Sequence, residues 1–180
     1  MLSNSYILAL ATAACASIAS AQTHVDIMGG LDQPLLLGGG NIAAAVATSH
    51  WDFEYSHGWS LRIGNYGFGL NGEEKRDHLV VTVPWTTGFG AGYRFTRRFT
   101  VLLDFKAHRF EVKEPGVAHT AYTTFSIGPT VYYKIPLYRG LFIQPNVRYW
   151  PTVANTLHST FVHHAHDWGV FPNMNLGWTF

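Results

Sequence analysis

The chain ends in PNMNLGWTF, residues 172–180, and this stretch decides which fold the sequence predicts. Apolar side chains occupy every second position, with small or polar ones between them. The apolar set is Pro172, Met174, Leu176, Trp178 and Phe180. Period-two alternation indicates a strand with one apolar face and one small or polar face. Because chain ends usually fray into solvent, a terminal Trp-x-Phe is expected where a strand lies against lipid.

The same alternation recurs upstream and predicts eight strands in all. Their expected ranges are 24–30, 41–56, 59–68, 78–95, 99–111, 121–134, 140–150 and 167–180. In 99–111, Val101, Leu103 and Phe105 share one face, while Asp104 and Lys106 share the other. A lysine that faces lipid at mid-membrane costs about 2–4 kcal/mol. The charged face is therefore expected inside a closed barrel and the apolar face outside.

The segment 78–95 is the longest alternating stretch. Its predicted outward residues are Leu79, Val81, Val83, Trp85, Thr87, Phe89, Ala91, Tyr93 and Phe95. Pro84 removes one ladder donor, so a bulge or break is predicted there. Gly88, Gly90 and Gly92 are expected to face inward and to leave room for bulky side chains across the barrel, such as Tyr122 and Phe142.

Connections of two lengths alternate along the chain. Long ones are expected at 31–40, 69–77, 112–120 and 151–166, and short ones at 57–58, 96–97 and 135–139. Outer-membrane barrels alternate short periplasmic turns with longer external loops in this way. Aromatic residues cluster near the predicted short turns and the C-terminus, as an interfacial girdle requires. They are Trp51, Phe53, Tyr55, Trp59, Tyr93, Phe95, Phe99, Trp178 and Phe180.

On these features, residues 22–180 resemble the small OmpA- or OmpX-like outer-membrane barrels of Gram-negative bacteria. The resemblance implies an all-β fold, an eight-stranded antiparallel up-and-down transmembrane barrel. It also implies that Leu176, Trp178 and Phe180 form a C-terminal signal for the barrel-assembly machinery. The implied partners are that machinery, periplasmic chaperones, outer-membrane lipid and lipopolysaccharide.

A soluble eight-stranded barrel of lipocalin type would show the same alternation with its faces exchanged. Such a barrel needs a densely charged exterior, whereas charged residues make up only 13% of this chain. The near balance of 12 Lys and Arg against 11 Asp and Glu also argues against nucleic acid as a partner. These observations favour a barrel in lipid.

Residues 1–21 are expected to be a secretory signal peptide. An apolar core over 7–16 precedes Ala19-Ser20-Ala21, an A-x-A site that predicts cleavage after Ala21. No Lys or Arg occurs in the first six residues, which departs from the usual pattern. Cys15 is the only cysteine and lies within this segment, so cleavage leaves no thiol. Acylation of Cys15 as a lipoprotein is the alternative.

Charged side chains of both signs are predicted to face the lumen. They are Asp26, Asp52, Glu54, Arg62, Arg94, Asp104, Lys106, Lys134 and Arg148. Unpaired, any of them would cost several kcal/mol, so a buried ion-pair network is expected. The interior of eight strands is narrow enough for side chains to fill. The network is therefore expected to plug the barrel, and a narrow polar pore is the alternative.

Ten histidines are many for 180 residues. One group, in and after the last long connection, consists of His158, His163, His164, His166 and Asp167. Imidazole and carboxylate groups bind zinc or copper, so this group is a candidate metal site. On an extended strand these side chains would point to both faces. A polar rim above the membrane is the expected role.

Some outer-membrane barrels modify lipid A or phospholipids with Ser and His at the rim, and His119, His158 and Ser159 are expected at that height. Adjacent side chains on a strand point to opposite faces, and a nucleophile needs a base within hydrogen-bond reach. The sequence therefore predicts a monomeric, non-enzymatic, cofactor-free surface protein. A narrow, porin-like channel and a rim-sited lipid-modifying enzyme are the alternatives.

Overall fold

The computed structural model describes residues 23–63, 79–113, 119–159, 162 and 165–180. Within these residues, ten strands and one short helix are present, and the strands form a single sheet. The predicted signal peptide and Cys15 lie outside the described residues. No helix in the described part of the chain has the length and apolar character needed to cross a membrane.

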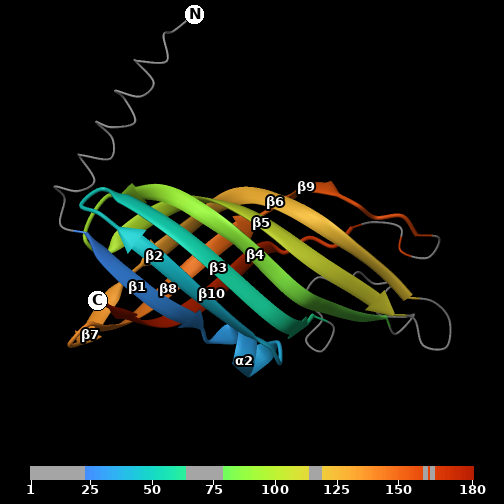
Figure 1. Ribbon diagram of the computed structural model, residues 1–180, viewed down its shortest axis with the longest axis horizontal. Helices are drawn as coiled ribbons and strands as arrows, with labels where there is room; N and C mark the ends of the chain where they lie inside the picture. The colour runs from blue at the N-terminus through green and yellow to red at the C-terminus, as the bar shows by residue number, and fades with distance from the viewer. Residues whose placement is uncertain (1–22, 64–78, 114–118, 160–161, 163–164) are drawn as a thin grey trace, which may run out of the picture.

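Eight of the strands form the wall of a closed antiparallel barrel (Figure 1). They are β1 (His24–Gly30), β2 (Gly40–Ala47), β3 (Trp51–Arg62), β4 (Val80–Arg94), β5 (Phe99–Lys113), β6 (His119–Tyr133), β8 (Leu141–Trp150) and β10 (Gly169–Thr179). β1 pairs with β10, β10 with β8, and β8 with β6, which closes the ring. The predicted fold class is therefore confirmed.

Two short strands and a helix complete the structure. β7 (Ile135–Tyr138) lengthens the turn before β8, and β9 (Thr152–Asn155) continues past Pro151 to pair with β6. Both lie in segments that were expected to be connections. α2 (Asp32–Leu36) lies in the connection between β1 and β2, which was expected to be a loop.

The two ends of the barrel differ in their connections. The turns at 48–50 and 95–98 lie at the same end as the start of β1 and the end of β10, and we call this the short-turn end. The opposite end, where α2 lies, is the long-loop end (Figure 1).

One predicted turn is wrong. His57 and Gly58 lie inside β3 and pair with Ile42 and Asn41 of β2. The chain reverses instead at 48–50, where Thr48 Oγ1 accepts the backbone N–H groups of His50 and Trp51. A Thr or Ser hydroxyl that caps its own turn is the local signal that could have located this reversal.

Inward and outward residues alternate through β5 as predicted. Asp104 is 0% and Lys106 4% exposed, whereas Leu103 is 47% and Phe105 36% exposed. The charged side chains are therefore enclosed, and the apolar ones cover the outside. This is the arrangement expected of a barrel in lipid rather than one in water.

Strand β4 changes phase near Pro84. The partners of Thr82 and Trp85 are Glu111 and Arg109, so β4 contains one extra residue between those pairs. The predicted bulge is confirmed, but its consequence was missed. Leu79, Val81 and Val83 were expected to face outward, and they are instead buried, because an inserted residue exchanges the two faces beyond it.

Candidate functional site

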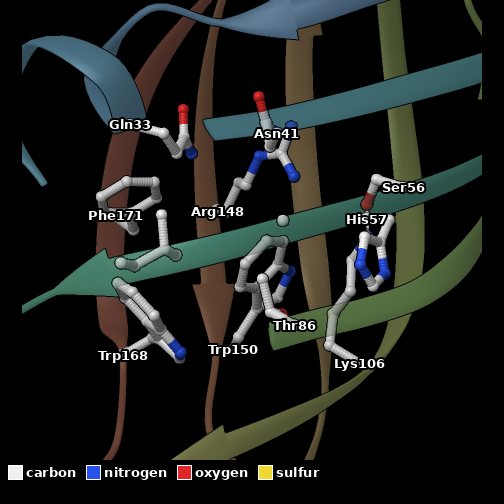
Figure 2. A pocket seen from close by; sticks show the side chains of 12 residues that line it. Gln33, Asn41, Ser56, His57, Thr86, Lys106, Arg148, Trp150, Trp168 and Phe171 are labelled. Atoms are coloured by element: carbon white, nitrogen blue, oxygen red, sulfur yellow. Dashed lines mark hydrogen bonds between the residues drawn. The ribbon is translucent and has the colours of Figure 1, made fainter. Parts of the chain in front are cut away.

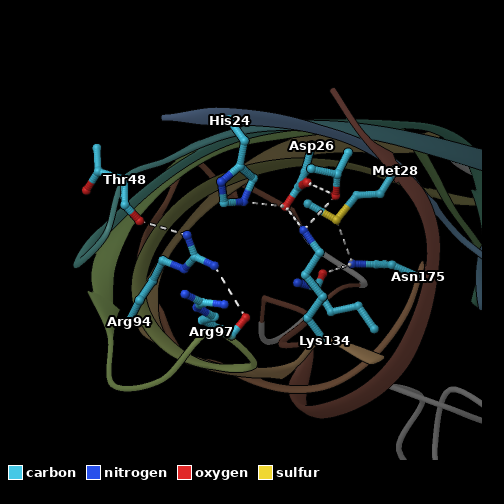
Figure 3. Close-up of polar contacts among 10 residues, drawn as sticks. His24, Asp26, Met28, Thr48, Arg94, Arg97, Lys134 and Asn175 are labelled. Atoms are coloured by element: carbon cyan, nitrogen blue, oxygen red, sulfur yellow. Dashed lines mark hydrogen bonds and ion pairs between the residues drawn. The ribbon is translucent and has the colours of Figure 1, made fainter. Parts of the chain in front are cut away.

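The lumen at the short-turn end holds a compact polar cluster (Figure 3). Lys134 Nζ lies 2.5 Å from Asp26 Oδ2 and 2.9 Å from Thr179 Oγ1. The Thr179 hydroxyl donates to Asp26 Oδ1 at 2.6 Å. The Nε2 atom of His24 lies 3.8 Å from the same carboxylate. This cluster joins β1, β10 and the residue that follows β6.

Arg94 lies nearby but does not join that cluster. Its guanidinium donates to the backbone oxygens of Thr48 at 2.7 Å and Arg97 at 3.4 Å (Figure 3). It therefore braces two neighbouring short turns.

Deeper in the barrel, charged groups are held by neutral partners. Asp104 Oδ2 accepts from Thr130 Oγ1 at 2.5 Å and from Trp150 Nε1 at 3.0 Å. Tyr132 donates its hydroxyl to Glu54 Oε2 at 2.7 Å. Because these partners come from β6 and β8, each carboxylate ties its own strand to another part of the wall.

The two buried cations of this layer are held in the same way. Lys106 Nζ donates to Ser56 Oγ at 2.5 Å, and Arg148 Nε donates to Asn146 Oδ1 at 2.8 Å. The Arg148 guanidinium also lies 5.0 Å from the ring centre of Trp150 and 5.4 Å from that of Tyr132. Contacts of this kind between a cation and an aromatic face are favourable when desolvated.

The nine charged residues that were predicted to face the lumen differ in how deeply they are buried. Buried residues are Asp26, Asp52, Glu54, Asp104, Lys106 and Arg148; Arg94 and Lys134 are half-buried, and Arg62 is exposed. Placing Arg62 inside was wrong, because β3 changes phase at Ser60, whose φ is 56°, so that Leu61 faces inward instead. Among the described residues, Lys134–Asp26 is the one Lys or Arg ion pair with a carboxylate.

The glycines of β4 make room for β5 rather than for the far wall. A Cβ at Gly90 would collide with the Asp104 carboxylate, and one at Gly88 with the backbone oxygen of Phe105. A Cβ at Gly92 would meet the Val101 backbone oxygen. The prediction that these glycines make room for Tyr122 and Phe142 is therefore wrong, because the adjacent strand β5 lies closest to them.

Toward the long-loop end the lumen becomes apolar, which sequence reasoning missed. The buried cluster there consists of Leu37, Leu61, Ile63, Leu79, Val81, Val83, Phe110, Val112, Tyr122 and Val162. Trp168, which comes directly before β10, and Phe171, which lies in β10, pack against it. The changes of phase in β3 and β4 turn aliphatic side chains inward at this level. Their inward position could be predicted only if both changes of phase were first located in the sequence.

The lumen contains a small cavity. A cavity of about 30 Å³ lies among Lys106, Arg148, Trp150 and Trp168 (Figure 2). Such a volume holds about one or two waters.

The candidate metal residues do not converge in the part of the chain that the structure describes. His158 is exposed, whereas His166 is 2% exposed, stacks on Phe110 and hydrogen-bonds the Tyr122 hydroxyl. Asp167 accepts the backbone N–H groups of Thr152 and Gly169. His163 and His164 lie outside the described residues. Across the described ranges, no three His, Cys, Asp or Glu side chains are grouped as a metal site requires.

The candidate catalytic residues of the rim have local partners. Ser159 Oγ lies 3.1 Å from Thr120 Oγ1 and accepts the backbone N–H of Val162 at 3.1 Å. His119 Nε2 lies 3.7 Å from Glu111 Oε2. These contacts join Ser159 to β6 and His119 to β5.

Asp32 lies outside the strands, in the first turn of α2. Burial raises the pKa of its carboxyl, whereas a backbone hydrogen bond at Met174 and the charge of Arg148 act in the opposite direction. Asp32 is half-buried.

The exterior of the barrel is apolar on every long strand. Examples are Ile27 at 42%, Phe53 at 45% and Val147 at 49% exposed. The predicted C-terminal signal lies on this surface: Leu176 and Trp178 are each 42% and Phe180 is 72% exposed. The backbone N–H of Phe180 donates to the Val25 oxygen at 2.8 Å, so the last residue is still joined to β1.

No protein-family model and no curated protein matches the chain in sequence. Its fold is similar to that of the Yersinia pestis outer membrane protein Ail in a phospholipid bilayer nanodisc. The TM-score is 0.50 at 13% identity, covering 88% of this chain and 100% of that one.

Two further solved structures are similar at lower scores. The crystal structure of Ail with the heparin analogue sucrose octasulfate has a TM-score of 0.46 at 11% identity, covering 88% of this chain and 96% of that one. A major outer membrane protein from Thermus thermophilus has a TM-score of 0.46 at 12% identity, covering 89% of this chain and 100% of that one. With its closed ring, enclosed charges and apolar exterior, the chain has the fold of the small eight-stranded outer-membrane β-barrels.

Proposed function

We propose that this chain is a monomeric, non-enzymatic outer-membrane protein whose plugged barrel has a structural or surface-interaction role. The observation that carries the proposal is the filled lumen. Arg148, Tyr132 and Phe142 are each at most 3% exposed and come from β6 and β8. Solute passage would require these side chains to leave their hydrogen bonds and ring contacts.

The proposal includes the route by which the protein reaches the membrane. The chain is exported, its signal peptide is cleaved after Ala21, and its last residues are read by the barrel-assembly machinery with the help of periplasmic chaperones. In the outer membrane it meets lipid and lipopolysaccharide through its apolar exterior. The outward position of Trp178 and Phe180 supports this route, because a signal of this kind must be accessible on an edge strand before closure.

Planar-bilayer recording tests the plug. Protein refolded into detergent, with folding verified by heat-modifiable migration on a denaturing gel, is expected to insert without conductance steps. A variant with Arg148→Ala and Trp150→Ala, which removes two side chains lining the lumen cavity, is the control for detecting a widened lumen. Reproducible single-channel steps from the wild type would contradict the closed lumen and favour the channel.

A lipid-hydrolysis assay tests the absence of catalysis. Purified, folded protein is incubated with phospholipid and with lipid A, and the Ser159→Ala variant is assayed in parallel. We expect no turnover from either protein. Turnover that is lost in Ser159→Ala would instead establish a rim-sited enzyme.

A further inference from the structure

The barrel wall contains a gap in strand pairing beside α2. β1 ends at Gly30, opposite Asn175 of β10, yet β10 extends back to Gly169. On the other side, β2 begins at Gly40, opposite Trp59, while β3 continues to Arg62. Residues 169–174 of β10 and 60–62 of β3, which lie toward the long-loop end, therefore have no wall strand between them.

α2 fills this gap with few backbone hydrogen bonds. Leu31 donates its N–H to the Met174 oxygen at 2.8 Å, and the N–H of Arg62 donates to the Leu37 oxygen at 2.8 Å. Here a helix replaces the continuous ladder found elsewhere in the wall.

A cavity of about 150 Å³ lies between α2 and β10. It is lined mainly by apolar side chains, among them Leu36, Leu37, Ile63, Val170 and Phe171. Leu37 and Ile63 are each 4% exposed, whereas Leu36 is 44% and Val170 66% exposed. The cavity therefore reaches from the outward face of the barrel to its buried interior.

The size and lining of the cavity favour a hydrocarbon guest. An apolar cavity of about 150 Å³ stays dry and holds a benzene-sized molecule. Its polar lining groups are Asp32, His166 and Asp167. Of these, His166 is bonded to Tyr122 and Asp167 to backbone N–H groups. Asp32 is half-buried in the first turn of α2, and the remaining lining side chains are apolar, so the cavity offers mainly hydrocarbon contact.

The exterior of the barrel around α2 is apolar. Leu35 is 71% exposed on α2, Ile42 50% on β2 and Met174 40% on β10. A molecule that moves along this exterior reaches the cavity without leaving an apolar surface. Membrane lipid is the hydrocarbon source in direct contact with that exterior.

We propose that this wall cavity binds part of an acyl chain of a membrane lipid, which enters laterally between α2 and β10. The site rests on the membrane location of the proposed function but not on the closed lumen. Trp168 and Phe171 line both this cavity and the small lumen cavity, so they separate the bound chain from the polar groups around the lumen cavity. Figure 2 shows both side chains beside the lumen cavity.

Photolabelling in vesicles tests the proposal. The full chain is reconstituted into phosphatidylcholine vesicles that contain a phospholipid with a diazirine-bearing acyl chain, illuminated and mapped by mass spectrometry. Labels are expected on Leu37 and Ile63, which lipid reaches only through the cavity. Labels on Leu103, which faces outward on β5, report insertion into the bilayer.

A filling variant and its matched control sharpen the result. Leu37→Phe places a larger side chain in the cavity and is expected to abolish labelling of Ile63 while leaving Leu103 labelled. Leu103→Phe makes the same change on the exterior and is expected to leave Ile63 labelled. Heat-modifiable migration verifies that each variant is folded, and the wild-type map decides the question even if Leu37→Phe does not fold.

Three outcomes overturn the proposal. Labels on Leu103 without labels on Leu37 and Ile63 reject the wall site and leave the membrane location intact. No label at any of these positions rejects both. Labelling of Leu37 by a soluble short-chain diazirine fatty acid, but not by the phospholipid, identifies a soluble ligand in place of membrane lipid.

Discussion

Lys134 and Asp26, separated by 108 residues of sequence, form an ion pair of 2.5 Å where the barrel closes. Their side chains are 14% and 5% exposed. Lys134 follows β6 and Asp26 lies on β1, while β8 and β10 lie between those strands in the sheet. The pair therefore links parts of the wall that share no backbone ladder.

Removing one partner of this pair leaves a charge enclosed without its counter-charge. Lys134→Met is expected to lower the free energy of unfolding by about 3 kcal/mol, the usual cost of breaking a buried pair. Urea titration of the refolded protein in detergent, followed by tryptophan fluorescence, measures the change. Lys113→Met, at an exposed strand end, is the control and should change stability by less than about 0.5 kcal/mol. An equal loss in both variants would contradict a special role for the pair.

The side chain of Asp104 occupies the space beside Gly90, so the two positions should be coupled. Gly90→Ala is expected to cost about 1–3 kcal/mol, because the new methyl displaces a carboxylate that holds Thr130 and Trp150. Combined with Asp104→Ala, Gly90→Ala should cost much less. Gly92→Ala collides with backbone instead, so Asp104→Ala should not relieve it. A double-mutant cycle by urea titration measures both couplings, and additive effects at Gly90 would refute the contact.

Ser60 has a φ of 56°, a conformation that costs residues with a Cβ about 1–2 kcal/mol. Ser60→Gly should therefore be more stable than Ser60→Val, in which a β-branched side chain is forced into the left-handed region. Thr87, whose φ is not positive, serves as the comparison, and there Val should be more stable than Gly. Thermal shift of the gel-mobility transition compares the four variants. The same order at both positions would show that β3 has no left-handed residue at Ser60.

The outward face of β5 should reject charge. Leu103→Lys is expected to destabilise the protein by about 2–4 kcal/mol in lipid vesicles, since the ammonium then faces hydrocarbon. Val80→Lys has a similarly exposed site, 51% against 47%, but lies at the long-loop end of β4 and should cost less than about 1 kcal/mol. Urea titration in vesicles compares the two, and equal costs would mean that β5 does not face the membrane core.

The strands in which apolar and polar side chains alternate without interruption were predicted well. β5 runs from Phe99 to Lys113 with one phase, so Asp104 and Lys106 could be placed inside from their spacing alone. The C-terminal strand was located for the same reason, because a period of two is a property of successive side chains. Arg62, Val81 and Val83 were misplaced because Ser60 and Pro84 interrupt that period.

The partners inside the barrel could not be read from the chain. Lys106 was expected to pair with carboxylates and instead donates to Ser56, which lies 50 residues away in sequence. Whether two inward residues meet depends on the register of every strand between them. A one-residue slip moves each side chain to the other face.

Alternation, composition and the aromatic C-terminus thus established a closed barrel with its apolar face outward, because each depends on local pattern. Tertiary structure alone decided where β3 and β4 exchange faces, which neutral groups hold Glu54 and Asp104, and where α2 interrupts the wall. Those features depend on strand register and on close approach between segments distant in the chain, and no local period encodes either.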